Sequence, residues 1–316
     1  MMDIQSEKFR AVYHAPGIYE QVLLPHFFDG VEDVDLVARL MLEHYGQPGN
    51  DRRLNVLDLG CGTGRVTTVL APYAATLYGI DSGGPMIAAF RQRFPDAQAA
   101  CLDIREAVEA MHAKGLAGTF DVVGAFWSLS YPILDLFEEM TSEGIRPRAD
   151  AADARRRADG FVRDVLSLVA PNGRLIVMFF DSETPEQRLV TQLWEQIAPF
   201  PGTGRGYARE IVIEGLRDAE SRGEGRLVHT RRGGVAAAPT PDAARRWFEI
   251  VHLKSFPALV SDPTTRAAVE RFAREHEQPS GEVLIPSGVH LIDFWKIESR
   301  AHVAGSAPAS LTRRLR

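Results

Sequence analysis

The stretch NVLDLGCGTGRVT at residues 55–67 joins the pattern of a buried strand to three closely spaced glycines. The apolar run before Gly60 is typical of a strand in a parallel sheet. Gly60, Gly62 and Gly64 permit positive φ angles and allow the backbone to approach a ligand closely. A helix that begins near Arg65 would direct its free N–H groups toward that ligand. The stretch therefore predicts a nucleotide-type loop between a strand and a helix.

The spacing of these glycines excludes two common nucleotide sites. A dinucleotide-binding fingerprint, G-x-G-x-x-G, would need a third glycine where the chain has Arg65. A P-loop would need Gly-Lys-Ser or Gly-Lys-Thr, which the stretch lacks. The loop is therefore predicted to hold a nucleoside ligand without a pyrophosphate.

Composition and charge limit the class of protein further. With 316 residues, 45% hydrophobic and 25% charged, the chain is expected to be a soluble globular protein of one or two domains. The net charge of -6 argues against nucleic acid as the main partner. We expect neither a membrane span nor a signal peptide. Two cysteines, Cys61 and Cys101, fit a reducing cytosol and no cysteine-bound metal, so the predicted location is cytoplasmic.

Short apolar runs alternate with amphipathic stretches through the middle of the chain. This alternation is typical of right-handed βαβ crossovers and a parallel sheet. The expected fold is α/β, a Rossmann-like doubly wound sheet that is mostly parallel with an antiparallel last strand. The expected strands are 55–60, 76–81, 98–103, 120–127, 173–180 and 289–297, and the expected helices are 64–73, 85–94, 104–114 and 155–169.

The flanking segments suggest additions to this sheet. Insertions near the carboxyl ends of strands commonly carry specificity in such folds. The predicted divisions are an N-terminal helical lid at 1–51, the α/β core at 52–184, an inserted substrate cap at 185–240, the end of the core at 241–299 and a flexible tail at 300–316. Within and after the cap we expect helices at 185–198 and 209–221, strands at 225–232 and 249–256, and a capped helix start at 240–248.

Five ordered stretches carry a resemblance to a known family. The glycine loop is followed by LYGIDSGGPMI at 77–87, AACLDI at 99–104, FDVVGAFWSLSYP at 120–132 and LSLVAPNGRLIVMFF at 166–180. In this order they resemble the motifs of the class I S-adenosylmethionine-dependent methyltransferases that act on small molecules. The resemblance covers the predicted core and is far more specific than one glycine-rich loop.

The resemblance implies S-adenosyl-L-methionine as cofactor and assigns roles to particular residues. In that family the residue at Asp81 accepts both ribose hydroxyls, while those at Asp103 and Ile104 receive the adenine amino group and cover the ring. The fourth-strand motif lies beside the transferred methyl group. The cofactor-binding residues expected on this basis are Tyr13, Tyr19, Asp58, Gly60, Cys61, Gly62, Asp81, Ser82, Met86, Asp103, Ile104, Phe126 and Trp127.

Several of these residues have a second interpretation that needs no ligand. Asp81 and Asp103 are each suited to capping the helix that follows them. Asp58, inside an apolar run, would accept N–H groups that shape the loop or lie near the ammonium of the ligand. Tyr13 and Tyr19 would close over the cofactor as a lid or simply pack as aromatic residues.

Methyl transfer is an in-line displacement that depends chiefly on alignment and exclusion of water. The acceptor must present a lone pair, and a hydroxyl acceptor usually needs a general base. The catalytic candidates are His14, Tyr131 and Asp181, and His229 is a further possible base. No acidic metal-ligand set is recognisable after the fifth strand, so no metal is expected.

The predicted acceptor is a small molecule. The Asn/Asp-Pro-Pro-Tyr/Phe signature of enzymes that methylate nucleobase amines or protein glutamine is absent, because the chain reads WSLSYP there. Arginines of the predicted cap would bind an acidic group or remain solvated. Interleaved aromatic residues favour either an apolar or planar acceptor or a cationic amine held in an aromatic cage. These residues are Phe126, Trp127, Tyr131, Phe179, Phe180 and Trp194, and we expect about half of them in the core.

The sequence thus favours methyl transfer to a nitrogen or oxygen of a small molecule, with a specialised metabolite preferred, by a monomer or homodimer. Two alternatives stay open. One is another transferase on the same fold, such as an aminopropyl transferase. The other is a cofactor-binding scaffold without catalysis.

Overall fold

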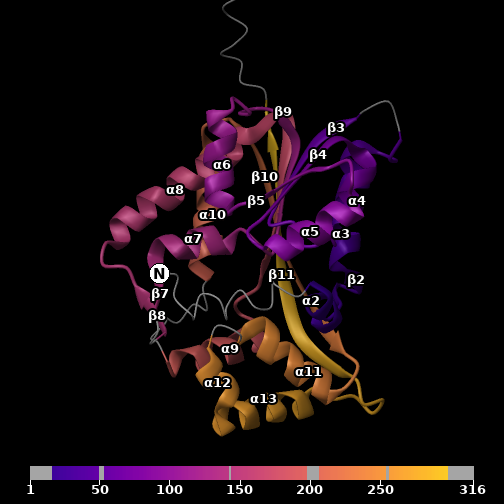
Figure 1. The fold of residues 1–316 in the computed structure, drawn as a ribbon, viewed down its shortest axis with the longest axis vertical. Coiled ribbons are helices and arrows are strands. Elements are labelled where there is room, and N and C mark those ends of the chain that lie inside the picture. The colour runs from indigo at the N-terminus through magenta and orange to yellow at the C-terminus, as the bar shows by residue number, and fades with distance from the viewer. Residues whose placement is uncertain (1–15, 50–52, 142–143, 198–205, 254–255, 298–316) are drawn as a thin grey trace, which may run out of the picture.

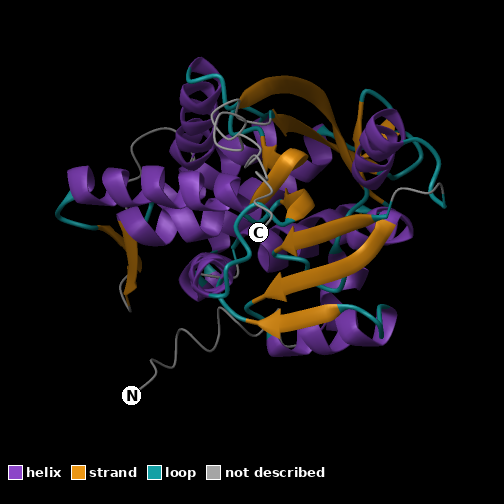
Figure 2. Cartoon of the chain, turned by 90° about the horizontal axis from the view of Figure 1, so that it is seen from above, coloured by secondary structure: helices purple, strands orange, loops and turns teal. Residues whose placement is uncertain are grey.

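The computed structural model describes residues 16–49, 53–141, 144–197, 206–253 and 256–297 (Figure 1). In these ranges one sheet has the strand order β2-β1-β10-β11-β9-β6-β3-β4-β5. Helices cover both faces of this sheet, as Figure 2 shows from above. The predicted α/β, Rossmann-like fold is confirmed.

The five strands at the right of that order form the parallel half of the sheet, as predicted. They are β9 (Val169–Phe180), β6 (Phe120–Phe126), β3 (Leu54–Leu59), β4 (Ala74–Asp81) and β5 (Gln98–Cys101). Crossover connections place helices between them. These are α4 (Thr67–Leu70), η1 (Ala71–Tyr73), α5 (Gly84–Arg93), α6 (Ile104–Ala113), α7 (Ser130–Phe137) and α8 (Ala151–Leu168). A helix is expected from the sequence in each of these connections, but α7 is not predicted, and the helix expected at 64–73 is shorter and ends in a 3-10 turn.

The other strands of the sheet are antiparallel. The last strand, β11 (Val283–Lys296), pairs with β9, which confirms the predicted antiparallel last strand. Strand β10 (Gly225–Ala238) pairs with β11 along its whole length, and β1 (His26–Phe28) pairs with the far end of β10. A short β2 (Val31–Glu32) completes the edge, while β7 (Glu138–Thr141) and β8 (Gly144–Pro147) form a separate hairpin.

Two apolar layers sandwich the sheet. On one face, buried side chains of α6, α8 and α10 (Gly206–Ser221) pack together, represented by Ile104, Phe161 and Ile211. On the other face α3 (Asp33–Tyr45) packs with α4 and α5 through residues such as Met41 and Phe90. The parallel strands lie between these layers, and this accounts for their near-continuous apolar sequences.

A third cluster of helices lies beyond the carboxyl edge of the parallel strands. Because Val289 pairs with Phe180, the last residue of β9, residues 283–288 of β11 project past that edge. The projecting ends of β10 and β11 pack with these helices, which we call the cap helices (Figure 1). They are α9 (Pro185–Glu195), α11 (Pro241–Trp247), η2 (Phe248–His252), α12 (Pro257–Ser261) and α13 (Pro263–Glu275).

The segment 185–240, for which an inserted cap is expected, divides between two parts of the structure. Helix α9 belongs with the cap helices, whereas α10 packs on the core sheet and β10 is a strand of that sheet. The predicted helix start at 240–248 is confirmed, because the Thr240 hydroxyl accepts the Ala243 N–H. The predicted strand at 249–256 is wrong, since Phe248–His252 forms a π-helix whose apolar side chains pack among the cap helices.

The N-terminal part of the described chain contains α2 (Pro16–Val22) in addition to β1, β2 and α3. Helix α2 contacts both α5 of the core and α11 of the cap. None of the helices in the described ranges combines the length and the apolar character needed to cross a membrane.

Candidate functional site

The glycine loop curls over the end of β4. Gly60, Gly62 and Gly64 have φ angles of 80°, 55° and 88°, all in the region that favours glycine. The N–H groups of Gly60 and Cys61 both donate to the carbonyl of Ile80, at 2.7 and 2.9 Å. These bonds hold the turn that the spacing of the glycines predicts.

The first two glycines of this loop differ in what surrounds them. A Cβ at Gly60 would lie 2.2 Å from the Cβ of Ser128, so the chain has no room for a side chain there. A Cβ at Gly62 would meet no atom of the described residues within 4 Å. The backbone at Gly62 therefore borders open space on the side where its side chain would project, and this fits a loop that receives a ligand.

Asp81 connects the loop to the next helix. Its Oδ2 accepts the Gly62 N–H at 2.9 Å and its Oδ1 accepts the Gly83 N–H at 2.8 Å. Burial raises the pKa of Asp81, and the two N–H groups oppose that rise. Each carboxylate oxygen has a second lone pair, so the side chain can order the loop and still accept hydroxyl groups of a ligand.

Asp58 lies beneath the loop and is almost completely buried. Its Oδ2 accepts the Thr67 hydroxyl at 2.5 Å, whereas its Oδ1 has no hydrogen-bond partner in the part of the chain that the structure describes. Burial raises the pKa of Asp58 to about 7, against the effect of Thr67, and the charge of Asp81 raises it further. An orphaned carboxylate oxygen next to a glycine loop fits the ammonium group of an amino-acid ligand.

Asp103 acts as the N-cap of α6, because its Oδ1 accepts the Arg105 N–H at 2.8 Å. The capping interpretation thus describes this side chain in the structure. Its side chain remains 37% exposed, so contact with a ligand is sterically open.

The other predicted cofactor residues differ in exposure. Cys61, Met86, Ile104 and Phe126 are buried, and Ser82 is exposed. Burial also raises the pKa of the Cys61 thiol, which is therefore neutral. Tyr13 and His14 lie outside the described residues, and Tyr19 lies in α2 with a side chain that is not described.

Helix α2 is tied to the glycine loop by Glu20. The carboxylate of Glu20 accepts the Thr63 hydroxyl at 2.6 Å and lies 3.3 Å from the guanidinium of Arg93 on α5. Because Thr63 is one of the loop residues, α2 is fastened over the loop. The contact places α2 next to the loop. The rest of the described part of the segment predicted as a helical lid belongs to the core, with β1 and β2 in the central sheet and α3 packed on it.

Trp127 follows β6 with a φ of 63°, an uncommon value for a residue other than glycine. Its indole stacks on Phe180 at the end of β9, with ring centroids 4.2 Å apart. Its Nε1–H donates to Asp33 at 3.1 Å. The predicted fourth-strand position therefore has a fixed aromatic side chain with a defined polar anchor.

Asp33 is a buried junction that the sequence reasoning missed. Its carboxylate accepts two hydrogen bonds from Arg65 of the glycine-loop region, at 2.8 and 2.5 Å, besides the one from Trp127. Burial alone would raise the pKa of Asp33, but the bonds and charge of Arg65 outweigh it and the pKa is lowered. An acidic residue at the start of α3 has no motif that could have indicated this role.

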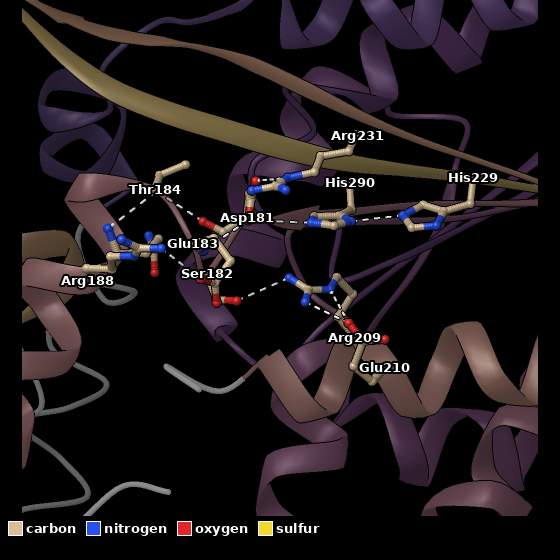
Figure 3. Close-up of polar contacts among 11 residues, drawn as sticks. Asp181, Ser182, Glu183, Thr184, Arg188, Arg209, Glu210, His229, Arg231 and His290 are labelled. Carbon is tan, nitrogen blue, oxygen red and sulfur yellow. Dashed lines mark hydrogen bonds and ion pairs between the residues drawn. The ribbon is translucent and has the colours of Figure 1, made fainter. Parts of the chain in front are cut away.

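Asp181, predicted to be catalytic, lies in a polar network on the α10 side of the sheet (Figure 3). It is buried, accepts Arg231 Nε at 2.5 Å and the Glu183 N–H at 3.0 Å, and lies 3.5 Å from His290 Nε2. Burial opposes these partners, yet the pKa of Asp181 is lowered. A carboxylate held in this way is a weak proton acceptor at neutral pH.

The same network contains the two histidines of the β10–β11 pair. His229 Nε2 lies 2.8 Å from His290 Nδ1, and the rings are stacked (Figure 3). Burial lowers the pKa of both, that of His290 to about 4, with Arg209 contributing. Arg209 donates to the Ser182 hydroxyl, which ties α10 to the end of β9.

The remaining predicted acceptor-site residues are spread over the structure. Tyr131 of α7 is 42% exposed, and Phe179 is buried on the α10 side of the sheet. Trp194 packs against Phe256 among the cap helices. Of the predicted aromatic residues, Trp127 and Phe180 stack on each other. Within the described ranges no group of three His, Cys, Asp or Glu side chains could hold a metal ion.

Comparison with known families identifies part of the chain. Residues 56–146 match the model of a family described as "Methyltransferase domain". The match includes the glycine loop, Asp81, Asp103 and Trp127, so this part of the chain is similar to methyltransferase domains. It confirms the resemblance to class I S-adenosylmethionine-dependent methyltransferases and S-adenosylmethionine as the cofactor. A search of curated proteins found no match.

Solved structures with a similar arrangement are distant. The YcgJ protein from Bacillus subtilis is 14% identical, with 84% of this chain and 98% of that chain covered and a TM-score of 0.47. A putative methyltransferase from Bacillus halodurans is 12% identical, with 84% and 99% covered and a TM-score of 0.47. Magnesium protoporphyrin IX methyltransferase from Synechocystis, solved with bound SAH, is 20% identical, with 64% and 74% covered and a TM-score of 0.38. At these TM-scores we base no conclusion on the likenesses.

Proposed function

We propose that this protein transfers a methyl group from S-adenosylmethionine to a nitrogen or oxygen of a small molecule, by in-line displacement and without a metal. The observation that carries the proposal is the glycine loop, with open space at Gly62 and an orphaned Asp58 oxygen beneath it. A nucleoside ligand that also carries an ammonium group satisfies both features.

Residues around the loop would hold the cofactor. Asp81 would accept the ribose hydroxyls, Asp58 would face the ammonium, and Ile104 with Met86 would contact the adenine ring. When bound, S-adenosylmethionine supplies an electrophilic methyl group on a sulfonium. The chain then has to align the acceptor and exclude water, because alignment is the main source of acceleration in such displacements. The Glu20 contact of α2 supports a role of the N-terminal segment in that exclusion.

The acceptor is proposed to be a planar or largely apolar molecule. The Trp127–Phe180 stack lies at the ends of β6 and β9, and the cap helices lie beyond that edge. Aromatic walls of this kind favour ligands with flat apolar faces. We further propose a cytoplasmic protein that works as a monomer or homodimer.

The proposal is tested first by cofactor binding. Isothermal titration of the full chain with S-adenosylmethionine is expected to give saturable binding that Asp81→Asn weakens at least tenfold. Asp96→Asn is the matched control, because Asp96 is an exposed carboxylate outside the loop contacts. Absence of binding to the wild-type protein would refute the proposal.

Turnover is tested next with a panel of phenols and amines, followed by mass spectrometry of S-adenosylhomocysteine and of the methylated acceptor. Formation of both products supports methyl transfer. Release of methylthioadenosine from the decarboxylated cofactor would instead indicate aminopropyl transfer. Cofactor binding without turnover of any acceptor would indicate the non-catalytic scaffold.

A further inference from the structure

His26 of β1 is a buried histidine that neither the motifs nor the family match assigns to a role. Pairing of His26 with Ala236 of β10 brings the N-terminal segment to the projecting part of the sheet. The residue is 6% exposed. Its Nδ1 lies 2.9 Å from the carbonyl oxygen of Leu24. Because a carbonyl only accepts hydrogen bonds, Nδ1 carries the proton of the neutral ring and Nε2 carries the lone pair.

Among the residues that the structure describes, none forms a hydrogen bond with the lone pair on Nε2, although the atom is buried. Leaving a buried polar atom unpaired costs about 1–3 kcal/mol, so each such atom requires an explanation. Four aromatic rings surround the imidazole. Their centroids lie 5.5 Å (Phe180), 5.8 Å (Trp247), 6.0 Å (Phe28) and 6.3 Å (Trp127) from that of His26.

Two of these rings, Trp127 and Phe180, form the stack at the ends of β6 and β9. His26 is therefore in the part of the molecule where the proposed acceptor would lie. A planar acceptor with one hydrogen-bond donor would satisfy both the rings and the unpaired nitrogen.

The charges around His26 suit a group that gains a proton. Burial lowers the pKa of His26, so the ring is neutral at pH 7. The carboxylates of Glu186 on α9 and Asp33 on α3 oppose this effect, and Arg65 reinforces it. The charges of Glu186 and Asp33 would stabilise an imidazolium formed here, although Glu186 also lies 3.0 Å from His252.

We propose that His26 is the general base of the reaction and that the acceptor is a planar aromatic molecule with a reacting hydroxyl, an inference that rests on the proposed function. An ammonium must lose its proton before it has a lone pair to attack with. A hydroxyl attacks with its proton in place and loses it as the new bond forms, so it needs a neutral base within hydrogen-bond reach.

The step balances as follows. The O–H bond of the acceptor breaks and its proton moves to Nε2 of His26, while an oxygen electron pair forms the bond to the methyl carbon. The carbon–sulfur bond of the donor breaks, and its electron pair stays on sulfur. The positive charge that sulfur loses is thus carried by the imidazolium, which releases the proton to water after the methyl ether leaves.

The first test uses His26→Asn. Asparagine can donate to the Leu24 carbonyl as Nδ1 does, but it lacks the basic nitrogen. We expect kcat with phenolic acceptors to fall about 10²- to 10⁴-fold, and the acidic limb of the pH profile of kcat to disappear. The affinity for S-adenosylmethionine should stay within about twofold if His26 acts on the acceptor alone.

His276→Asn is the matched control. His276 makes the same type of bond, from Nδ1 to the carbonyl of Phe272 at 2.8 Å, on α13. It should leave kcat and its pH profile unchanged. A His26→Asn enzyme with wild-type kcat and an intact acidic limb would overturn the proposal, because a merely structural histidine would give that result.

A second measurement needs neither turnover nor a folded variant. In wild-type protein labelled with ¹⁵N-histidine and saturated with S-adenosylhomocysteine, addition of 4-nitrophenol should shift the Nε2 resonance of His26 and leave that of His276 in place. An unmoved Nε2 resonance at saturating 4-nitrophenol would overturn the proposal. Turnover of amines but of no phenol would also overturn it while leaving the proposed methyltransferase function intact, whereas loss of cofactor binding would refute that function itself.

Discussion

Replacement of Asp58 by asparagine should change how the stability of the protein depends on pH. Burial raises the pKa of Asp58 to about 7 in the folded protein, whereas an unfolded chain has an aspartate pKa of about 3.9. Between these values the folded state holds a proton that the unfolded state has lost. The contribution of Asp58 to the free energy of unfolding is therefore at its maximum below about pH 4, and it decreases as the pH rises toward 7.

The size of the effect follows from the two pKa values. Relative to its value at low pH, the contribution of Asp58 to stability falls by about 1.5 kcal/mol at pH 5, because the unfolded chain ionises first, and by about 4 kcal/mol at pH 8. The asparagine introduced by Asp58→Asn would have no charge and would still accept the Thr67 hydroxyl. The stability of Asp58→Asn relative to wild type should thus rise by about 2.5 kcal/mol between pH 5 and pH 8.

Urea unfolding of the cofactor-free protein at several pH values between 5 and 8 measures this difference. His26 and His290, whose pKa values are lowered, shift stability in the opposite direction, but they do so in both proteins and cancel in the comparison. Asp96→Asn, on the exposed surface, should run parallel to wild type. If Asp58→Asn also runs parallel to wild type, Asp58 is not protonated in the folded protein and the argument from its burial fails.

Three further substitutions test the loop and the aromatic stack. Gly60→Ala, with a φ of 80° and a Cβ 2.2 Å from that of Ser128, should lose about 2–4 kcal/mol in urea unfolding; a smaller loss than in Gly62→Ala would contradict the geometry. Gly62→Ala, whose Cβ would project into open space, should lower the free energy of unfolding by only about 1 kcal/mol. Calorimetry should show S-adenosylmethionine binding weakened at least tenfold, and unchanged affinity would show that this glycine is not part of the site. Trp127→Phe keeps an aromatic ring but loses the hydrogen bond to Asp33, so we expect the free energy of unfolding to fall by about 1.5–3 kcal/mol. An unchanged unfolding midpoint would contradict this expectation.

Local patterns predicted the parallel half of the fold well. The strands around the glycine loop are short apolar runs between amphipathic helices, and that alternation depends on residues close together in sequence. The loop itself was predictable because positive φ at Gly60 and Gly62 leaves a direct mark on the sequence. The strand expected at 249–256 failed because a short apolar run does not distinguish a strand from a buried helix.

The candidate site was predictable only where a motif marked it. His26 meets Trp127 and Trp247 through pairing of β1 with the distant strand β10, and no local pattern encodes that contact. In the sequence Asp33 resembles any acidic residue at the start of a helix, although in the structure both Arg65 and the Trp127 indole donate hydrogen bonds to it. Contacts between segments far apart in sequence leave no periodic signal, so the acceptor side of the site required the structure.

The Asp33 junction connects the two sides of the candidate site energetically. One carboxylate anchors both Arg65, next to the glycine loop, and Trp127, in the aromatic stack. If a ligand displaced Arg65, the shared carboxylate would transmit the change to the indole, and the affinities of the two sides would be linked by the same factor in each direction. Donor occupancy would then prepare the aromatic wall for the acceptor, and the emission of Trp127 would report on that preparation before any methyl group is transferred.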